Sequence, residues 1–143
     1  MGYIPSKKTM AHGILFDSRD EAAYYSYLLE QPNITGVVRQ PQYTLLQPFH
    51  VVCSKCKGEG KKPSPKTGKP IKCTTCNQTG KRLRQAWTYT ADFLVTYNDG
   101  YEEVIDVKGF ANERFPLVKK MFEWVYGIEL IVVKRKGKEW VRK

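Results

Sequence analysis

The chain has 143 residues, of which 41% are hydrophobic and 27% are charged. This composition is typical of one folded domain with its own core, and it excludes a disordered or fibrous chain. No apolar run is long enough to span a membrane, and the first residues lack the apolar segment of a secretory leader. We therefore expect a cytoplasmic protein without a membrane partner.

The net charge of +10 is concentrated in two segments. Residues 53–84 contain ten lysine and arginine residues against one glutamate, and residues 134–143 contain six against one glutamate. Clustered cations gain affinity for a polyanion through counterion release, so we expect a polyanionic partner. The alternative is a surface whose charge only keeps the protein dissolved.

The first predicted element is a helix that begins at Ser18 and ends before Pro32. Its apolar residues recur at helical spacing, from Tyr24 to Leu29. Ser18 and Glu21 have the spacing of a capping box, in which the glutamate bonds back to the serine amide. Residues 36–46 then predict a strand with an edge or bend at Pro41.

Four cysteines follow in a C-x2-C-x16-C-x2-C pattern, at positions 53, 56, 73 and 76. Two such pairs can complete a closed tetrahedral zinc site, which predicts a structural zinc bound by Cys53, Cys56, Cys73 and Cys76. Disulfides are one alternative, and His50 as a substitute ligand is another. Residues 53–60 resemble the CxxCxGxG repeat of the DnaJ chaperone zinc domain, whereas residues 76–80 lack its first glycine.

The remaining predicted elements lie after this lobe. Residues 87–97 and 101–108 predict a β-hairpin around Asn98-Asp99-Gly100, residues 115–125 an amphipathic helix, and residues 128–133 a strand. Residues 50–86 therefore form a zinc-binding insertion, and residues 1–49 and 87–143 form one host domain. Its predicted order is α-β-β-β-α-β, an α/β fold with a mixed sheet flanked by helices.

The hairpin carries Asp92 and, fourteen positions later, Asp106-Val107-Lys108. Alternation along a strand puts Asp106 and Lys108 on one face. Two carboxylates can hold Mg²⁺ near a scissile phosphate, and the lysine can orient the attacking water or help to deprotonate it. The alternative is an exposed strand face with an incidental salt bridge.

These stretches resemble the PD-(D/E)XK nuclease superfamily, and in particular its small phage-encoded endonucleases. The resemblance rests on Tyr89-Thr90-Ala91-Asp92-Phe93, on Asp106-Val107-Lys108-Gly109 and on residues 16–25, which lead into the first predicted helix. Two positions depart from the pattern: Ala91 stands where the family has proline, and Asp106 where glutamate is commoner. The resemblance covers nearly the whole host domain.

The resemblance implies a restriction-endonuclease-like fold and an endonuclease that requires Mg²⁺ or Mn²⁺. Its catalytic residues would be Glu21, Asp92, Asp106 and Lys108, with the three acids as metal ligands. It further implies a homodimer that cuts branched phage DNA, such as a Holliday junction, in the host cytoplasm. The alternatives are a non-catalytic zinc-dependent nucleic-acid-binding protein and a DnaJ-like partner-binding module.

The expected DNA contacts are the cations of the zinc lobe and one lysine of the second helix. They are Lys55, Lys57, Lys61, Lys62, Lys66, Lys69, Lys72, Lys81, Arg82, Arg84 and Lys120.

Overall fold

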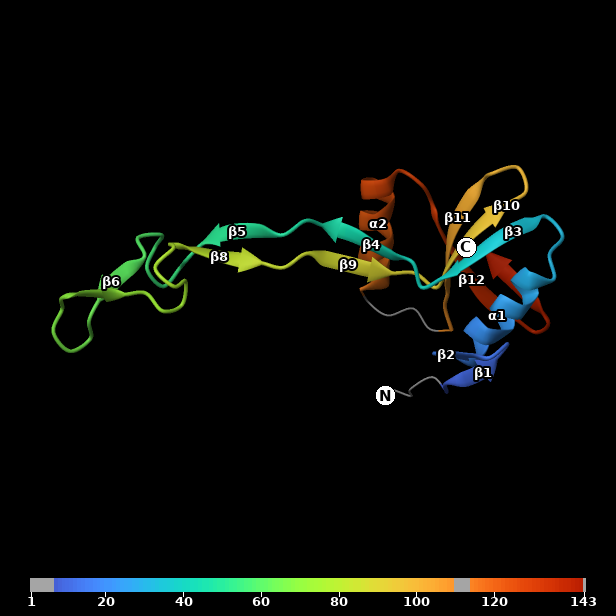
Figure 1. Cartoon of the computed structure of the whole chain (residues 1–143), viewed down its shortest axis with the longest axis horizontal. Helices are drawn as coiled ribbons and strands as arrows, with labels where there is room; N and C mark the ends of the chain where they lie inside the picture. Colours follow the sequence, from blue (N-terminus) through green and yellow to red (C-terminus); the bar gives the residue numbers. More distant parts are fainter. Residues whose placement is uncertain (1–6, 110–113, 143) are drawn as a thin grey trace. The chain divides into compact units, whose positions relative to one another are not determined.

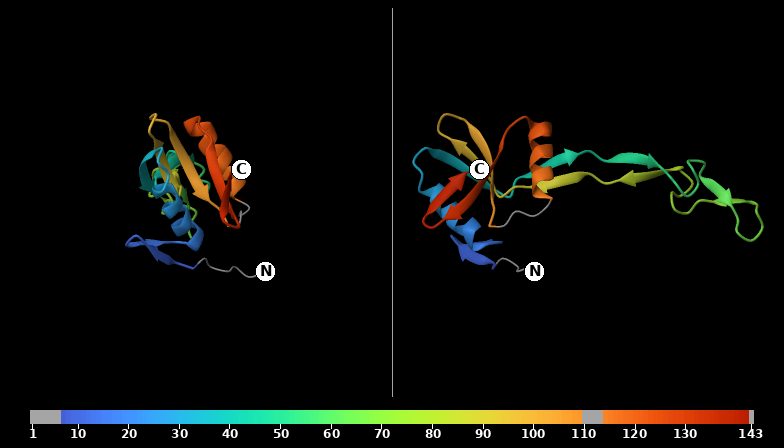
Figure 2. Two further views of the ribbon diagram at one scale, coloured as in Figure 1. Left: turned by 90° about the vertical axis from the view of Figure 1, so that its right-hand side faces the viewer. Right: turned by 180° about the vertical axis from the view of Figure 1, so that it is seen from behind.

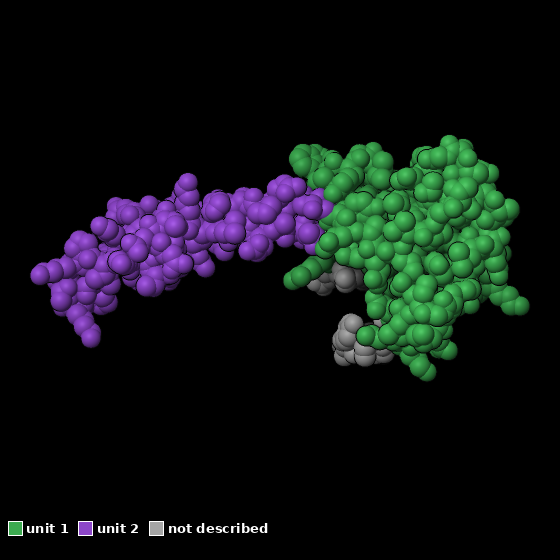
Figure 3. Space-filling view, viewed as in Figure 1, with its two compact units in different colours: residues 1–43, 89–143 green, residues 44–88 purple. Residues whose placement is uncertain are grey.

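The computed structural model describes residues 7–109 and 114–142 of a mixed α/β protein. The chain divides into two compact units (Figure 3). Unit 1 consists of Met1–Tyr43 and Tyr89–Lys143, and unit 2 consists of Thr44–Thr88. The lobe predicted at residues 50–86 lies within unit 2.

Unit 1 is built on a five-stranded sheet (Figure 1). The strands in spatial order are β13 (Glu139–Arg142), β12 (Leu130–Lys136), β11 (Glu102–Val107), β10 (Phe93–Tyr97) and β3 (Ile34–Arg39). Neighbouring strands are antiparallel except β11 and β12, which are parallel and are joined through a helix. The sheet is therefore mixed, as the sequence predicts.

Two helices flank this sheet, α1 (Arg19–Leu29) and α2 (Phe115–Tyr126) (Figures 1 and 2). The predicted cap at Ser18 is present, because its Oγ accepts the backbone N–H of Glu21 at 3.1 Å. Helix α2 ends at Gly127, whose φ of 70° suits a residue without a Cβ. Neither of these helices is long and apolar enough to cross a membrane.

The two faces of the sheet have different neighbours. On one face, Phe93 and Ile105 are fully buried against Tyr24 and Leu28 of α1. Because side chains alternate along β11, Asp106 points to the opposite face. On that side Phe122 of α2 is completely buried and contacts the rings of Tyr43 and Tyr89. The buried acid thus lies on the α2 face, beside an aromatic cluster.

The structure adds elements that the predicted order α-β-β-β-α-β lacks. A short hairpin of β1 (Thr9–Ala11) and β2 (Ile14–Phe16) precedes α1, and β13 follows β12. The strand predicted at residues 36–46 is two strands, β3 and β4 (Gln42–Leu46), because Gln40 adopts a φ of 52° between them. These additions extend the fold without changing its class.

Unit 2 consists of short antiparallel strand pairs. Strand β5 (Phe49–Val52) pairs with β8 (Lys81–Arg84), and β6 (Lys61–Pro63) pairs with β7 (Pro70–Lys72). A further pair joins β4 and β9 (Trp87–Thr90). The segment between the two cysteine pairs therefore contains two short paired strands. The cysteines lie in the turns between these pairs.

Candidate functional site

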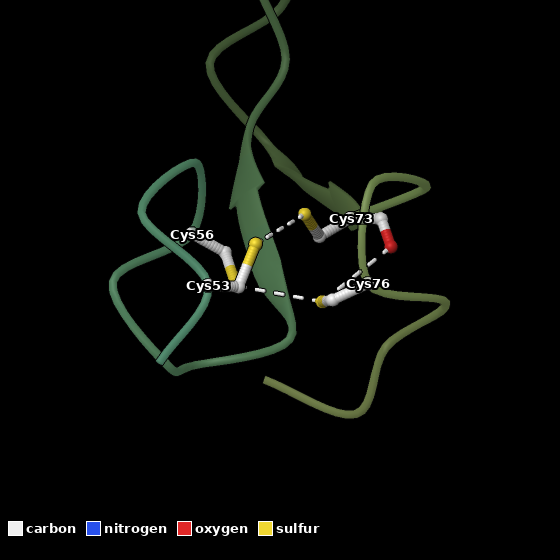
Figure 4. A group of neighbouring side chains, drawn as sticks. All are labelled: Cys53, Cys56, Cys73 and Cys76. Carbon is white, nitrogen blue, oxygen red and sulfur yellow. Dashed lines mark hydrogen bonds between the residues drawn. The ribbon is translucent and has the colours of Figure 1, made fainter. Parts of the chain in front are cut away.

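The four cysteines of unit 2 are buried together (Figure 4). The Sγ atoms of Cys53 and Cys73 are 3.9 Å apart, and those of Cys56 and Cys76 are 3.7 Å apart. A zinc ion with bonds of about 2.3 Å to four sulfurs gives a tetrahedron with edges of about 3.8 Å. All four cysteines are free, and these Sγ–Sγ distances are far longer than a disulfide bond of about 2.05 Å. The cluster can therefore hold a metal ion such as zinc.

The cysteine cluster is an internal repeat with a shift of 20 residues. Cys53 N–H donates to the carbonyl of Gly80, and Cys73 N–H donates to the carbonyl of Gly60, both at 2.9 Å. The N–H groups of the same two glycines also donate to sulfur, at 3.2 Å to Cys56 and 3.3 Å to Cys76. Donors that face sulfur stabilise the thiolate form that a metal requires.

The second half keeps this geometry without its first glycine. Gln78 occupies the position of Gly58, and both have positive φ, 67° and 85° respectively. Gly80 is indispensable in a different way, because a Cβ there would lie 2.3 Å from the carbonyl oxygen of Gly58. Among the described residues, the ligand atoms of the four cysteines all lie within 4.8 Å of one another, and His50 does not belong to this group. The ligand set is thus the four cysteines.

Most of the predicted DNA-contacting cations are exposed. Ten of them lie in unit 2, where Lys62 and Arg82 are half-buried and the other eight are exposed. The eleventh, Lys120, lies on the exposed side of α2 in unit 1. Glu59 is the acid of this stretch, so the surface of the cysteine lobe is strongly positive.

A second cluster, in unit 1, contains the predicted acids of the host domain. Asp106 lies on β11 and only 2% of its surface is exposed. Asp92 lies between β9 and β10, where its Oδ2 accepts the backbone N–H of Val107 at 2.7 Å. The carboxyl group of Asp106 is close enough to raise the pKa of Asp92. The hairpin register therefore brings together two acids that are fourteen positions apart in sequence.

Two side chains hold Asp106 from different sides. Lys108 Nζ is 3.3 Å from Asp106 Oδ1, and it also lies 4.4 Å from the centre of the Phe115 ring. Tyr89 O–H donates to the other oxygen, Oδ2. The lysine was expected from the alternation of β11, whereas the tyrosine contact was not expected, because it depends on the packing of β9.

Glu21 reaches the same cluster from α1. Its carboxyl group is close to that of Asp92, and the charges of Asp17 and Asp106 act on it. Ser18 caps the helix, but the Glu21 side chain is directed towards the acids. The oxygens of Glu21, Asp92 and Asp106 do not all lie within 4.8 Å of one another, whereas the cysteine sulfurs do. The acids are neighbours rather than a closed ligand set.

Burial and mutual repulsion make this cluster difficult to ionise. Burial and the neighbouring carboxyl groups of Asp106 and Glu21 raise the pKa of Asp92 to about 9. Burial and the charges of Asp17 and Asp106 raise the pKa of Glu21 as well. Strongly perturbed acids that face one another are typical of functional sites, where a cation or substrate offsets the repulsion.

Two neighbours of Asp92 explain a departure from the expected pattern. Ala91 N–H donates to the carbonyl of Pro41 at 3.0 Å, and Gln40 N–H donates to the carbonyl of Asp92 at 2.9 Å. A proline at position 91 would lack the N–H that makes the first of these bonds. The Gln40 side chain in turn donates to Asp17 at 3.4 Å. Sequence reasoning had assigned neither Asp17 nor Gln40 to the site.

Residues 3–138 match the family model described as "Protein of unknown function (DUF1064)", so the chain belongs to this family. The match includes both the cysteine cluster and the acidic cluster. Comparison with curated proteins and with solved structures gave no match. The family description names no activity, and the function has to be argued from the two clusters themselves.

Proposed function

We propose that the chain is a metal-dependent nuclease that hydrolyses phosphodiester bonds in DNA, with a restriction-endonuclease-like core in unit 1. The observation that carries the proposal is the buried Asp106, which lies across the hairpin from Asp92 and 3.3 Å from Lys108. A strand face with an incidental salt bridge would not bury an acid beside a second one. This burial supports the catalytic interpretation over that alternative.

The donor set suits Mg²⁺ or Mn²⁺, because both prefer carboxylate oxygens and retain several waters. Asp92 and Asp106 would hold the ion, with Glu21 as a third acid at its edge. A divalent cation held there would supply stabilisation of the charge that develops on the scissile phosphate. Three carboxyl groups lie near one lysine, so a divalent cation would balance the negative charge that appears when they ionise.

The other residues would orient the reacting groups. Val107 N–H holds one Asp92 oxygen, and Tyr89 O–H holds one Asp106 oxygen, so the remaining oxygens have fixed directions. Lys108 Nζ is partly exposed next to Asp106, where it can orient the attacking water or bind the phosphate. Fixed ligands of this kind reduce the reorganisation that the reaction requires.

Lys134 supports this arrangement on the neighbouring strand. Val133 pairs with Val107 and is buried on the α1 face, so alternation directs Lys134 to the face of Asp106. Lys108 N–H bonds to the carbonyl of Val133, which makes Lys134 a neighbour of Lys108. Two lysines side by side at an acidic cluster are suited to hold a phosphate backbone across it.

We further propose branched DNA, such as a Holliday junction, as the substrate and a homodimer as the active form, because two cuts need two sites. The zinc lobe of unit 2 would bind DNA through its lysines and would take no part in chemistry. Four thiolates complete the coordination sphere of zinc, so no position is left for a metal-bound water.

The test is cleavage of a four-way junction, a linear duplex and a single strand by the zinc-loaded full chain. Each substrate is incubated with Mg²⁺, with Mn²⁺ and without either ion. Asp106→Asn and Lys108→Met are expected to abolish cleavage. Their matched controls are Glu102→Gln, an exposed acid on the same strand, and Lys138→Met, an exposed lysine of the β12–β13 turn. Both controls should cleave like the wild type.

Each outcome decides between the candidates. Cleavage that needs the divalent ion and is lost only in the two site variants supports the nuclease. DNA binding without cleavage supports the non-catalytic binding protein instead. A chain that neither cuts nor binds DNA points to a DnaJ-like module.

A further inference from the structure

The cysteine lobe of unit 2 has a depression of about 470 Å³ next to the second pair of cysteines. Its lining contains two cations, Lys81 and Arg82, one aromatic ring, His50, and one amide, Asn77. Thr75 and Thr79 add two hydroxyl groups, and the described residues that line the depression include no acid. The volume is within the range of small-molecule sites, and the groups are those that bind phosphates and nucleobases.

The internal repeat indicates that this lining is not a by-product of the zinc fold. A shift of 20 residues relates the two halves bond by bond, yet the side chains at the matching positions differ. Pro70 matches His50, Lys57 matches Asn77 and Glu59 matches Thr79. The backbone alone does not require asparagine, because Lys57 has a φ of 55° and Asn77 a φ of 53°.

A nucleobase would also suit the apolar side of the depression. His50 pairs with Leu83 across β5 and β8, so the ring and the isobutyl group share a face. Half of the Leu83 surface is exposed, which the fold itself does not explain. A flat base could stack on this surface while Asn77 bonds to its edge and Lys81 or Arg82 contacts the phosphate.

We infer that this depression binds one unpaired nucleotide of a DNA strand. A base inside a duplex is stacked and paired, so it cannot enter a pocket of this kind. The inference rests on the proposed DNA binding, and it narrows the substrate class to DNA with unpaired nucleotides, at a branch point or in a single strand. The first cysteine pair, with Lys55 and Lys57, would contact only phosphates.

Binding is measured by fluorescence anisotropy with the zinc-loaded full chain and no added divalent cation. The probes are an oligothymidylate, an oligomer of equal length with abasic sites, and a blunt duplex. The wild type should bind the abasic oligomer about tenfold more weakly than the oligothymidylate, because stacking of one base contributes about this much. This comparison needs no variant. Equal binding of the two single strands would overturn the inference.

Variants then locate the effect. His50→Ala should weaken oligothymidylate binding by about tenfold and leave duplex binding and the salt dependence unchanged. Asn77→Gly, which keeps the positive φ, should act in the same direction. Ser54→Ala is the neutral control at the first cysteine pair, and Lys57→Ala should weaken all probes alike with a shallower salt dependence. Zinc content is measured for each variant.

The failure of this inference can be told apart from the failure of the proposed function. No cleavage is scored, so an inactive acidic cluster leaves the result unaffected. If His50→Ala weakens no probe, or all of them equally, the pocket is wrong while DNA binding stands. If the wild type binds none of the probes, the pocket and the proposed DNA binding are both wrong.

Discussion

Asp92→Asn is expected to change how stability depends on pH. In the cation-free protein, burial and the neighbouring acids raise the pKa of Asp92 to about 9, against 3.8 for an unperturbed aspartate. The folded chain therefore keeps a proton on Asp92 that the unfolded chain has released. Asparagine keeps an oxygen for the Val107 N–H and removes the titration.

The sign and size of the effect follow from proton linkage. A raised pKa in the folded state means that stability is lost as pH rises from about 4 to about 9. One proton contributes a slope of about 1.4 kcal/mol per pH unit, or about 7 °C in Tm for a unit of about 100 residues. Mg²⁺ bound to the acids should reverse this loss, more strongly at about pH 8 than at about pH 6.

The assay is thermal unfolding of the wild type and of Asp92→Asn from about pH 6 to about pH 8, each with and without Mg²⁺. Both proteins contain the same cysteine cluster, so its own titration cancels in the difference between them. Asp99→Asn, at an exposed turn, should behave like the wild type. If the difference in Tm stays constant over this range, or Mg²⁺ stabilises both proteins equally, the reasoning is refuted.

Lys108→Met is expected to lower the single-turnover cleavage rate at least about 100-fold and to change the DNA affinity by no more than about twofold. If the rate and the affinity fall equally, Lys108 contributes to DNA binding alone. Gly80→Ala should lose zinc, because its Cβ would lie 2.3 Å from a backbone oxygen. Gly68→Ala, with similar φ and open space around it, should keep the metal. Phe122→Ala should lower the free energy of unfolding in urea by about 3–5 kcal/mol, whereas Trp124→Ala, 79% exposed, should change it little.

The cysteine cluster could be predicted from sequence because its determinants are local. The two C-x2-C pairs and the glycines after them fix a turn each, and the metal joins the turns. The absence of a glycine at position 78 does not indicate a different turn, because Gln78 adopts the same left-handed backbone as its counterpart Gly58. Positions 20 residues apart in the two halves carry different side chains. The sequence alone does not show that these positions correspond, whereas the matching backbone hydrogen bonds do.

The acidic cluster could be predicted only in part. Alternation along one strand relates Asp106 to Lys108, and the hairpin turn relates both to Asp92. The contact of Tyr89 with Asp106 depends on how β9 packs against α2, which no period in the sequence encodes. Asp17 is connected to the cluster by the hydrogen bond from the Gln40 side chain, and the positive φ of Gln40 also ends β3.

The missed strands share a physical cause. Strands β1, β2, β6 and β7 have three residues each, too few to display a period of two. The end of β12 is rich in lysine and arginine, and β13 has a charged residue at each of its two ends, so an apolar pattern does not detect them. Their stability comes from pairing and from contacts such as Trp140 on Tyr24, which are distant in sequence.

The two clusters differ in the metal that each would select, and this difference makes them experimentally separable. Four thiolates are soft ligands that favour zinc and close its coordination sphere, whereas carboxylates favour Mg²⁺ or Mn²⁺ and leave room for water. Withholding Mg²⁺ should therefore stop chemistry at Asp92 and Asp106 without unfolding the cysteine lobe. The lobe has little other than its metal to order it, since the cysteines are its buried cluster. The DNA binding that we propose for the lobe can thus be measured on an intact protein in which no strand is cut.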